Sequence, residues 1–141
     1  MTTFLDASAL VKRYVEEDRS CVVREVFQVG VPVAISRQSI AEVATALCRR
    51  CRDGDLLPAD RDAVLDALAL DESTFHVVEL TDDVTRESIQ LLRRHPLRAG
   101  DAVQLASCVV LARELGTELR FVAFDDSLSR AARSEGLTVI A

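Results

Sequence analysis

Short apolar runs alternate along the chain with longer segments in which apolar residues recur every three or four positions. The runs are rich in β-branched residues and predict strands over residues 2–5, 31–35, 75–80, 119–124 and 138–140. The longer segments have the period of amphipathic helices, and the clearest of them cover residues 9–17, 20–28, 59–70, 82–94 and 127–134. Strands that alternate with helices form parallel βαβ units. We therefore predict an α/β fold, a three-layer α/β/α sandwich around a central parallel sheet of about five strands.

Two further helices are predicted from apolar stripes in the middle and in the last third of the chain. One stripe consists of Ile40, Val43, Ala44, Leu47, Cys48 and Cys51, and the other of Leu105, Cys108, Val109 and Ala112. All four cysteines fall within helical patterns and have no paired spacing in loops, so we predict reduced thiols rather than disulfides.

The composition is typical of a protein that folds on its own. Hydrophobic residues make up 49% of the chain and charged residues 28%, which is too apolar for a disordered segment. With a length of 141 residues, we expect a single domain over residues 1–141. No apolar stretch approaches the roughly 18 residues that cross a bilayer, so we expect a cytoplasmic protein without membrane contact.

The net charge of −6 bears on whether the chain can bind nucleic acid by charge alone. Proteins that hold nucleic acid by charge alone use a surplus of Lys and Arg, which this chain lacks. A cluster of carboxylates that binds divalent cations reverses the sign of the local charge. The composition therefore excludes a purely electrostatic nucleic-acid binder but not a metal-dependent nuclease.

Two aspartates directly follow predicted strands. Asp6 follows the first strand and Asp125 the fourth, and open α/β sheets bind their ligands at the carboxyl ends of the strands. Each aspartate also precedes a predicted helix, where Asp is a favoured N-cap residue. The pattern alone leaves a capping role and a functional role open for both.

Asp101 carries a stronger signal because it is in register with a buried stripe. It lies four, seven and eleven residues before Leu105, Cys108 and Ala112, so its carboxylate is expected to face inward. An acid in the first turn also interacts favourably with the helix macrodipole, which explains its position along the helix but not its inward face. We therefore interpret Asp101 as a functional residue.

Glu42 is the most ambiguous of the candidate acids. It ends the sequence Ser39-Ile40-Ala41-Glu42, which is the pattern of a capping box in which the glutamate bonds back to the amide of Ser39. It also lies off the apolar stripe of its helix. Taken alone, the local pattern favours a cap.

Four carboxylates at one edge of a sheet would need a counter-ion. Two like charges 4 Å apart repel by about 4 kcal/mol at an effective dielectric constant of 20. Oxygen ligands suit Mg²⁺ or Mn²⁺, and no nearby Cys or His pair indicates zinc. Ser8 and Arg98 are candidate substrate-binding residues because they lie close in sequence to Asp6 and Asp101, with a helix cap and a solvated charge as the alternatives.

Four segments of the chain resemble, in the same order, the PIN-domain toxins of the VapC type. They read FLDASALVKRY, SRQSIAEVATAL, LRAGDAVQLAS and FVAFDDSLSRAA. Their order and spacing make the set more specific than any one of them. The resemblance implies that Asp6, Glu42, Asp101 and Asp125 form an acidic quartet that binds Mg²⁺ or Mn²⁺, with Asp126 as an alternative to Asp125.

The same resemblance has implications for the fold, the activity and the partners. It implies the strand order 3-2-1-4-5, with the first and fourth strands side by side. It also implies an endoribonuclease that hydrolyses RNA with metal-activated water, a homodimer, and inhibition by a small antitoxin. The middle helices, which include the less regular segment 53–73, would contact the second copy or the antitoxin.

Two other functions fit parts of the pattern. A phosphoacceptor receiver domain also gathers acids at the carboxyl ends of strands, but it needs a lysine after a late strand. The one lysine of this chain is Lys12, in the first predicted helix. A catalytically silent PIN-like module that binds RNA or a protein would keep the fold without the chemistry, and the presence of all four acids argues against it.

Overall fold

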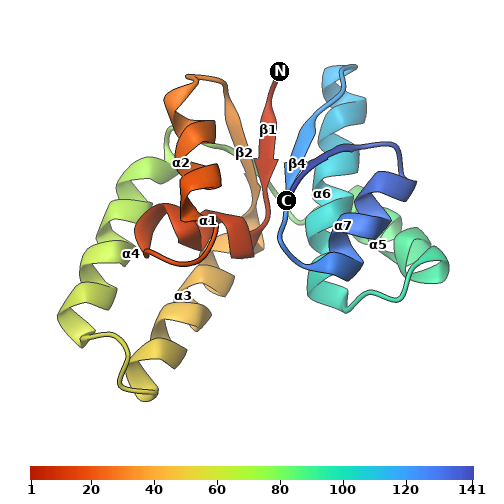
Figure 1. The fold of residues 1–141 in the computed structure, drawn as a ribbon. Helices are drawn as coiled ribbons and strands as arrows, with labels where there is room; N and C mark the ends of the chain where they lie inside the picture. The colour runs from red at the N-terminus through yellow and green to blue at the C-terminus, as the bar shows by residue number, and fades with distance from the viewer.

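The computed structural model describes residues 1–141 and contains a parallel sheet with helices on both faces (Figure 1). The strands are β1 (Thr3–Leu5), β2 (Val33–Ser36), β3 (His76–Val78), β4 (Arg120–Val122) and β5 (Thr138–Ile140). The helices are α1 (Ala7–Tyr14), α2 (Ser20–Gln28), α3 (Arg37–Arg52), α4 (Pro58–Glu72), α5 (Asp82–Arg94), α6 (Ala99–Leu115) and α7 (Asp126–Ser134). The sheet order is β3-β2-β1-β4-β5, and all neighbours are parallel. The predicted three-layer sandwich and the implied strand order are confirmed.

Successive residues of each strand point into two separate apolar cores, as the pleat of a strand requires. Phe4 and Phe121 point to one side, where their rings stack with centroids 5.7 Å apart, and helices α5, α6 and α7 cover them. Leu5 and Val122 point to the other side, which α1, α2, α3 and α4 cover. The two groups of helices lie on opposite sides of the sheet in Figure 1.

Several strands are shorter than the apolar runs that predicted them. β4 ends at Val122, although the run continues to Phe124. The side chain of Phe124 packs against the core on the α1 side, and the ammonium of Lys12 lies 5.2 Å from its ring centroid. Phe124 is therefore covered by tertiary contacts outside the sheet, and the chain turns into α7 immediately after it.

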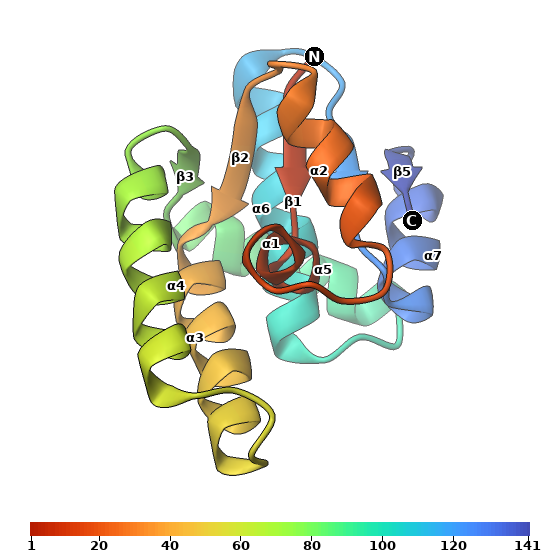
Figure 2. The same ribbon diagram turned by 60° about the vertical axis from the view of Figure 1, so that its left-hand side comes forward.

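All five strands run in the same direction, so their carboxyl ends share one edge of the sheet. Helices α1, α3 and α7 begin at or just beyond this edge, at the lower side of Figure 1. Helices α3 and α4 form an antiparallel pair that extends past it, as Figure 2 shows. None of the helices combines the length and the apolar character that a membrane span needs.

Candidate active site

Asp6 lies directly after β1 and is buried, with only 4% of the residue exposed. Its backbone N–H donates to the carbonyl of Val122 at 3.1 Å, which continues the pairing of β1 with β4. Its Oδ1 accepts the N–H of Ala9 at 2.9 Å, so Asp6 is the N-cap of α1. The Ser8 hydroxyl donates to the same carboxylate, 2.8 Å from Oδ1 and 3.0 Å from Oδ2. The capping role that the sequence pattern allowed is therefore present, and it does not exclude a functional role at the end of the strand.

The carboxyl group of Asp6 has a strongly shifted proton equilibrium. Burial raises its pKa to about 7, and the negative charges of Asp101 and Glu42 add to the rise. The hydrogen bonds from Ala9 and Ser8 oppose the shift but do not cancel it. In the metal-free protein this carboxyl is therefore partly protonated at neutral pH, whereas an adjacent cation would favour its charged form.

Glu42 does not belong to a capping box, so that interpretation of the sequence is wrong. Helix α3 begins at Arg37, and the Ser36 hydroxyl caps it by accepting the Gln38 N–H. Ser39 therefore lies inside the first turn, where its buried hydroxyl accepts from the Gln104 amide at 2.8 Å. The half-buried Glu42 side chain is therefore not used to cap the helix.

The Glu42 carboxylate is held between α3 and α6. The Gln38 amide donates to Glu42 Oε1 at 2.6 Å and to the carbonyl of Gly100 at 3.0 Å. A Cβ at Gly100 would lie 3.6 Å from the same oxygen, so α6 approaches the carboxylate closely at this residue. Burial and the charge of Asp101 raise the pKa of Glu42, and the amides of Gln104 and Gln38 lower it.

The sequence analysis missed Gln38 and Gln104 as residues of the site. A signal for both was present in their spacing. Gln38 lies four residues before Glu42 and Gln104 three residues after Asp101, and these spacings place side chains on one helix face. An amide beside a candidate carboxylate on the same face is a residue that can hold that carboxylate in one orientation.

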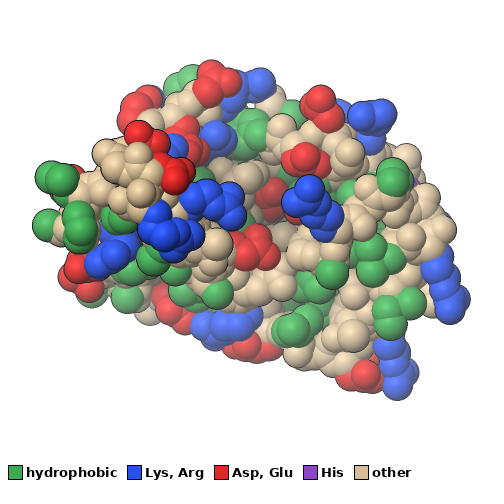
Figure 3. Space-filling view, turned by 90° about the horizontal axis from the view of Figure 1, so that it is seen from below, with side chains coloured by type: hydrophobic (Ala, Val, Ile, Leu, Met, Phe, Trp, Pro, Cys, Tyr) green, Lys and Arg blue, Asp and Glu red, His purple; other side chains and the backbone are tan.

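Asp101 and Asp125 line an open hollow of about 360 Å³ together with Pro96, Arg98 and Ser127. Asp101 stands in the first turn of α6, and burial and the charge of Asp125 raise its pKa while Arg98 lowers it. Asp125 is the N-cap of α7, where its Oδ2 accepts the Leu128 N–H at 2.8 Å. Figure 3 views this edge of the molecule end on and shows red carboxylates in its middle with blue cationic side chains on either side.

The four predicted acids lie along one edge of the sheet as linked pairs. Asp101 is the common member, since its charge raises the pKa values of Asp6 and Glu42 and its own pKa responds to Asp125. The acids do not close into a tight cluster, because no three His, Cys, Asp or Glu side chains lie close enough to hold a metal ion by themselves. The structure thus brings the predicted residues together more loosely than a site made of protein ligands alone would require.

The two candidate substrate-binding residues differ in their surroundings. Arg98 precedes α6 on the rim of the hollow, and its charge acts on Asp101. Ser8 is exposed, but its hydroxyl proton is already donated to Asp6. Contacts of Arg98 and of Ser8 with a substrate stay predictions.

Residues 3–134, nearly the whole chain, match the family model of the PIN domain. The chain belongs to the PIN-domain family. Among curated relatives of this PIN domain is the ribonuclease VapC46 of Mycobacterium tuberculosis, which is 31% identical over 138 residues, or 98% of this chain and 95% of the relative.

Solved structures share the fold of this PIN domain over nearly its full length. The VapC20 toxin of Mycobacterium tuberculosis, described as cleaving the sarcin-ricin loop, superposes with a TM-score of 0.68 at 23% identity and covers 93% of this chain and 95% of its own. A toxin–antitoxin complex from Klebsiella pneumoniae gives a TM-score of 0.64 at 18% identity and covers 99% of this chain and 96% of the matched chain. At these identities the likeness establishes the fold of the PIN domain and no finer property.

Proposed function

We propose that this PIN domain is a Mg²⁺- or Mn²⁺-dependent endoribonuclease and the toxin of a toxin–antitoxin pair. The observation that supports the proposal is the placement of four carboxylates from four different elements along the carboxyl edge of the sheet, with neighbouring charges that raise the pKa values of Asp6, Glu42 and Asp101. Membership of a family with relatives named ribonucleases supports the same conclusion.

The residues present fit a hard divalent cation. Every candidate ligand is a carboxylate oxygen, and the pKa values of Asp6, Glu42 and Asp101 are each raised in part by the charge of a neighbouring acid, which a cation would offset. Mg²⁺ usually keeps several waters and is bound directly by one or two carboxylates. Such an ion therefore needs only one or two of these acids as direct ligands, and the remaining acids would bind its waters.

Different side chains around the site would bind the cation, orient Glu42 and bind the phosphate during phosphodiester hydrolysis. The cation, when bound, supplies an activated water and positive charge for the phosphate. Asp6, Glu42, Asp101 and Asp125 would hold it, one or two of them directly and the others through its waters. The hydrogen bonds from Ala9 and Leu128 fix the orientation of the Asp6 and Asp125 carboxylates. Gln38 holds Glu42 against α6. Arg98 would bind the phosphate backbone and reduce the repulsion between RNA and the acidic edge.

The partners that we propose are a small antitoxin and a second copy of the chain. The Klebsiella pneumoniae structure is a toxin–antitoxin complex with the same fold. Helix α4 and its preceding residue expose two large apolar side chains, Leu57 at 67% and Leu70 at 78%. They stand near opposite ends of the helix and form no continuous patch, so a partner on the middle helices stays a prediction. Formation of a homodimer stays a prediction.

Cleavage of RNA by the purified protein tests the proposed function. We expect fragments with defined 5′ ends in Mg²⁺ or Mn²⁺ and none in EDTA. Asp125→Asn keeps the N-cap of α7, because Asn caps as well as Asp, and is expected to lose cleavage. Asp126→Asn removes the same charge from the next residue, which is exposed, and is expected to cleave like wild type. Equal rates in wild type and Asp125→Asn would contradict the assignment of the fourth acid. Metal-independent cleavage would contradict the metal mechanism, and absent cleavage would favour a silent module.

The amide of Gln38 gives a second prediction about the site. Gln38→Met keeps the length of the side chain but removes the donor that ties Glu42 to Gly100, so the Mg²⁺ concentration for half-maximal cleavage should rise about 10-fold or more. A Mg²⁺ titration of the cleavage rate measures this. Gln90→Met, at an exposed position of α5, is the matched control. An unchanged Mg²⁺ midpoint in Gln38→Met would exclude a positioning role for this amide.

A further inference from the structure

A second hollow adjoins the acidic one. It measures about 140 Å³ and lies between the turn after α5 and the outer face of α7, where it is lined by His95, Pro96, Ser127, Arg130, Ala131 and Ser134. Pro96 and Ser127 also line the acidic hollow, so the two hollows share a wall. A strand of RNA bound in the acidic hollow would therefore reach the second hollow directly.

The guanidinium of Arg130 has no acidic partner, although acids outnumber bases in this chain by 23 to 17. Arg130 takes part in none of the ion pairs of the protein. Asp126 lies one turn before it at a spacing that allows a pair, yet none forms. Glu135 is engaged by Arg94 at 2.8 Å and by His95 at 2.9 Å. The charge of Arg130 is therefore available to an anion from outside the protein.

The wall of this hollow has the chemistry of a phosphate site. Arg130 offers a planar set of N–H donors, which suits phosphate oxygens, and Ser127 and Ser134 add hydroxyl groups. The remaining lining residues are His95, Pro96 and Ala131, and none of them carries a negative charge that would oppose a phosphate. At about 140 Å³ the hollow is large enough for a phosphate group.

We propose that this hollow binds the phosphate next to the one that is cleaved, with Arg130 as its principal ligand and Ser127 between the two sites. The inference rests on the proposed ribonuclease function and deepens it, since it assigns a second backbone contact to the same RNA strand. Two phosphates held at fixed positions would align the strand across the carboxylates, which is how positioning contributes to catalysis.

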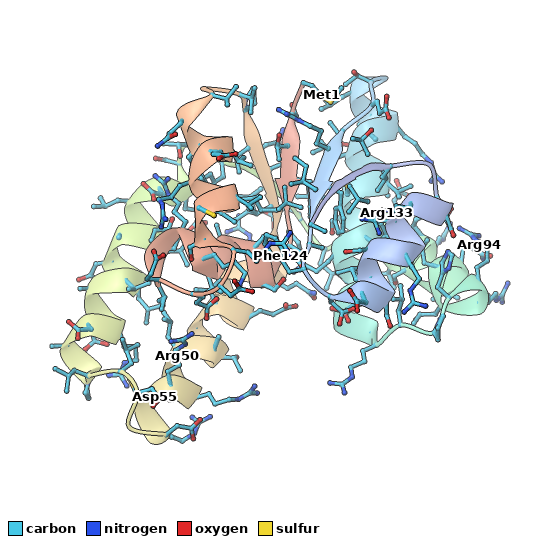
Figure 4. All side chains as sticks on the ribbon, viewed as in Figure 1. Met1, Arg50, Asp55, Arg94, Phe124 and Arg133 are labelled. Carbon is cyan, nitrogen blue, oxygen red and sulfur yellow. The ribbon has the colours of Figure 1, made fainter.

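Binding to a short single-stranded oligouridylate tests the proposal apart from catalysis. The background is Asp101→Asn, and the compared changes are Arg130→Ala and Arg133→Ala. Arg133 is the matched control because it lies on the same helix, is exposed and unpaired, and lines neither hollow; Figure 4 labels it near the C-terminal end of α7. We expect Arg130→Ala to weaken binding about 10-fold at low salt and Arg133→Ala to change it little. The slope of log affinity against log salt should become shallower by about 0.7 for Arg130→Ala alone.

Neutral methylphosphonates in a cleaved RNA identify which phosphate Arg130 contacts. Replacing one linkage beside the cut should slow wild type as much as Arg130→Ala does, and the two changes together should cost no more than either alone. Equal effects of the two arginine variants on binding, or an unchanged salt slope for Arg130→Ala, would overturn the inference. These binding results hold whether or not the protein cleaves RNA, so they separate a failure of this subsite from a failure of the proposed function.

Discussion

Asp6→Asn is expected to abolish RNA cleavage and, at the same time, to stabilise the metal-free protein at neutral pH. Asn keeps the N-cap of α1, since its side-chain oxygen can still accept the N–H of Ala9. It cannot carry the negative charge that a divalent cation requires. Because even residues that only support metal ligands contribute about 10–100-fold to activity, loss of this carboxylate should slow cleavage by at least about 100-fold.

The gain in stability follows from the raised pKa of Asp6. In the folded metal-free protein the carboxyl keeps its proton up to about pH 7, whereas in the unfolded chain it releases the proton near its ordinary value of 3.8. The contribution of Asp6 to the free energy of unfolding of wild type therefore falls as the pH rises from about 4 to about 7 and stays low above that range. Asn is uncharged and has no such loss. The difference at pH 8 should be on the order of 2–4 kcal/mol, since one pKa unit corresponds to about 1.4 kcal/mol.

Urea unfolding in EDTA at pH 4 and pH 8 measures this difference. The two proteins should be nearly equal at the lower pH, and the variant should be the more stable at the higher pH. Addition of Mg²⁺ should then stabilise wild type but not the variant, because a ligand stabilises only the state that binds it. Asp18→Asn, at an exposed position without an ion pair, is the control for loss of one charge. A variant that is less stable than wild type at pH 8 would contradict the burial of a charged group at this site.

Asp101→Asn is expected to stop cleavage and to lower the pKa values of two other carboxyls. Asp101 is the acid whose charge acts on both Asp6 and Glu42. Its loss should lower both pKa values, while that of Asp6 stays above 3.8 because burial is the larger cause. The cleavage rate should fall by at least about 100-fold, for the same reason as in Asp6→Asn.

NMR titration of the side-chain carboxyls in the metal-free protein tests this coupling, and a cleavage assay in Mg²⁺ tests the activity. Asp83→Asn is the matched control, because Asp83 also stands in the first turn of a helix and interacts with its macrodipole, but lies on α5 outside the site. Unchanged titration of both Asp6 and Glu42 in Asp101→Asn would show that the three carboxyls do not share one site.

The sequence predicted the parts of the site that local periodicity encodes. Asp6 and Asp125 were located by the strands before them, and Asp101 by its register with Leu105, Cys108 and Ala112. The fold class followed from the alternation of strands and helices, because that pattern admits few layer arrangements. The strand order came from the resemblance, since β1 pairs with both β2 and β4 and nothing local in either run specifies its neighbour.

The local pattern around Glu42 pointed to a cap, because the contact that decides its role is not local, and only the resemblance included it among the acids of the site. Two serines, Ser36 and Ser39, can each cap a helix at this point. Ser36 takes the role since Ser39 finds a buried partner in Gln104, 65 residues further along the chain. A pattern within one helix does not contain that partner. The same holds for Gln38, whose second bond reaches Gly100 on another helix.

The pairing of β1 with β4 determines the earliest point in translation at which the four acids can lie along one edge of the sheet. A ribosome that has just added Gly100 has already made Asp6 and Glu42, but neither Asp101 nor Asp125 has been synthesised. The emerging polypeptide can pair β1 with β2, yet its other neighbour, which contains Val122, is still to come. A nascent chain can therefore complete the proposed acidic site only after β4 and Asp125 have been synthesised.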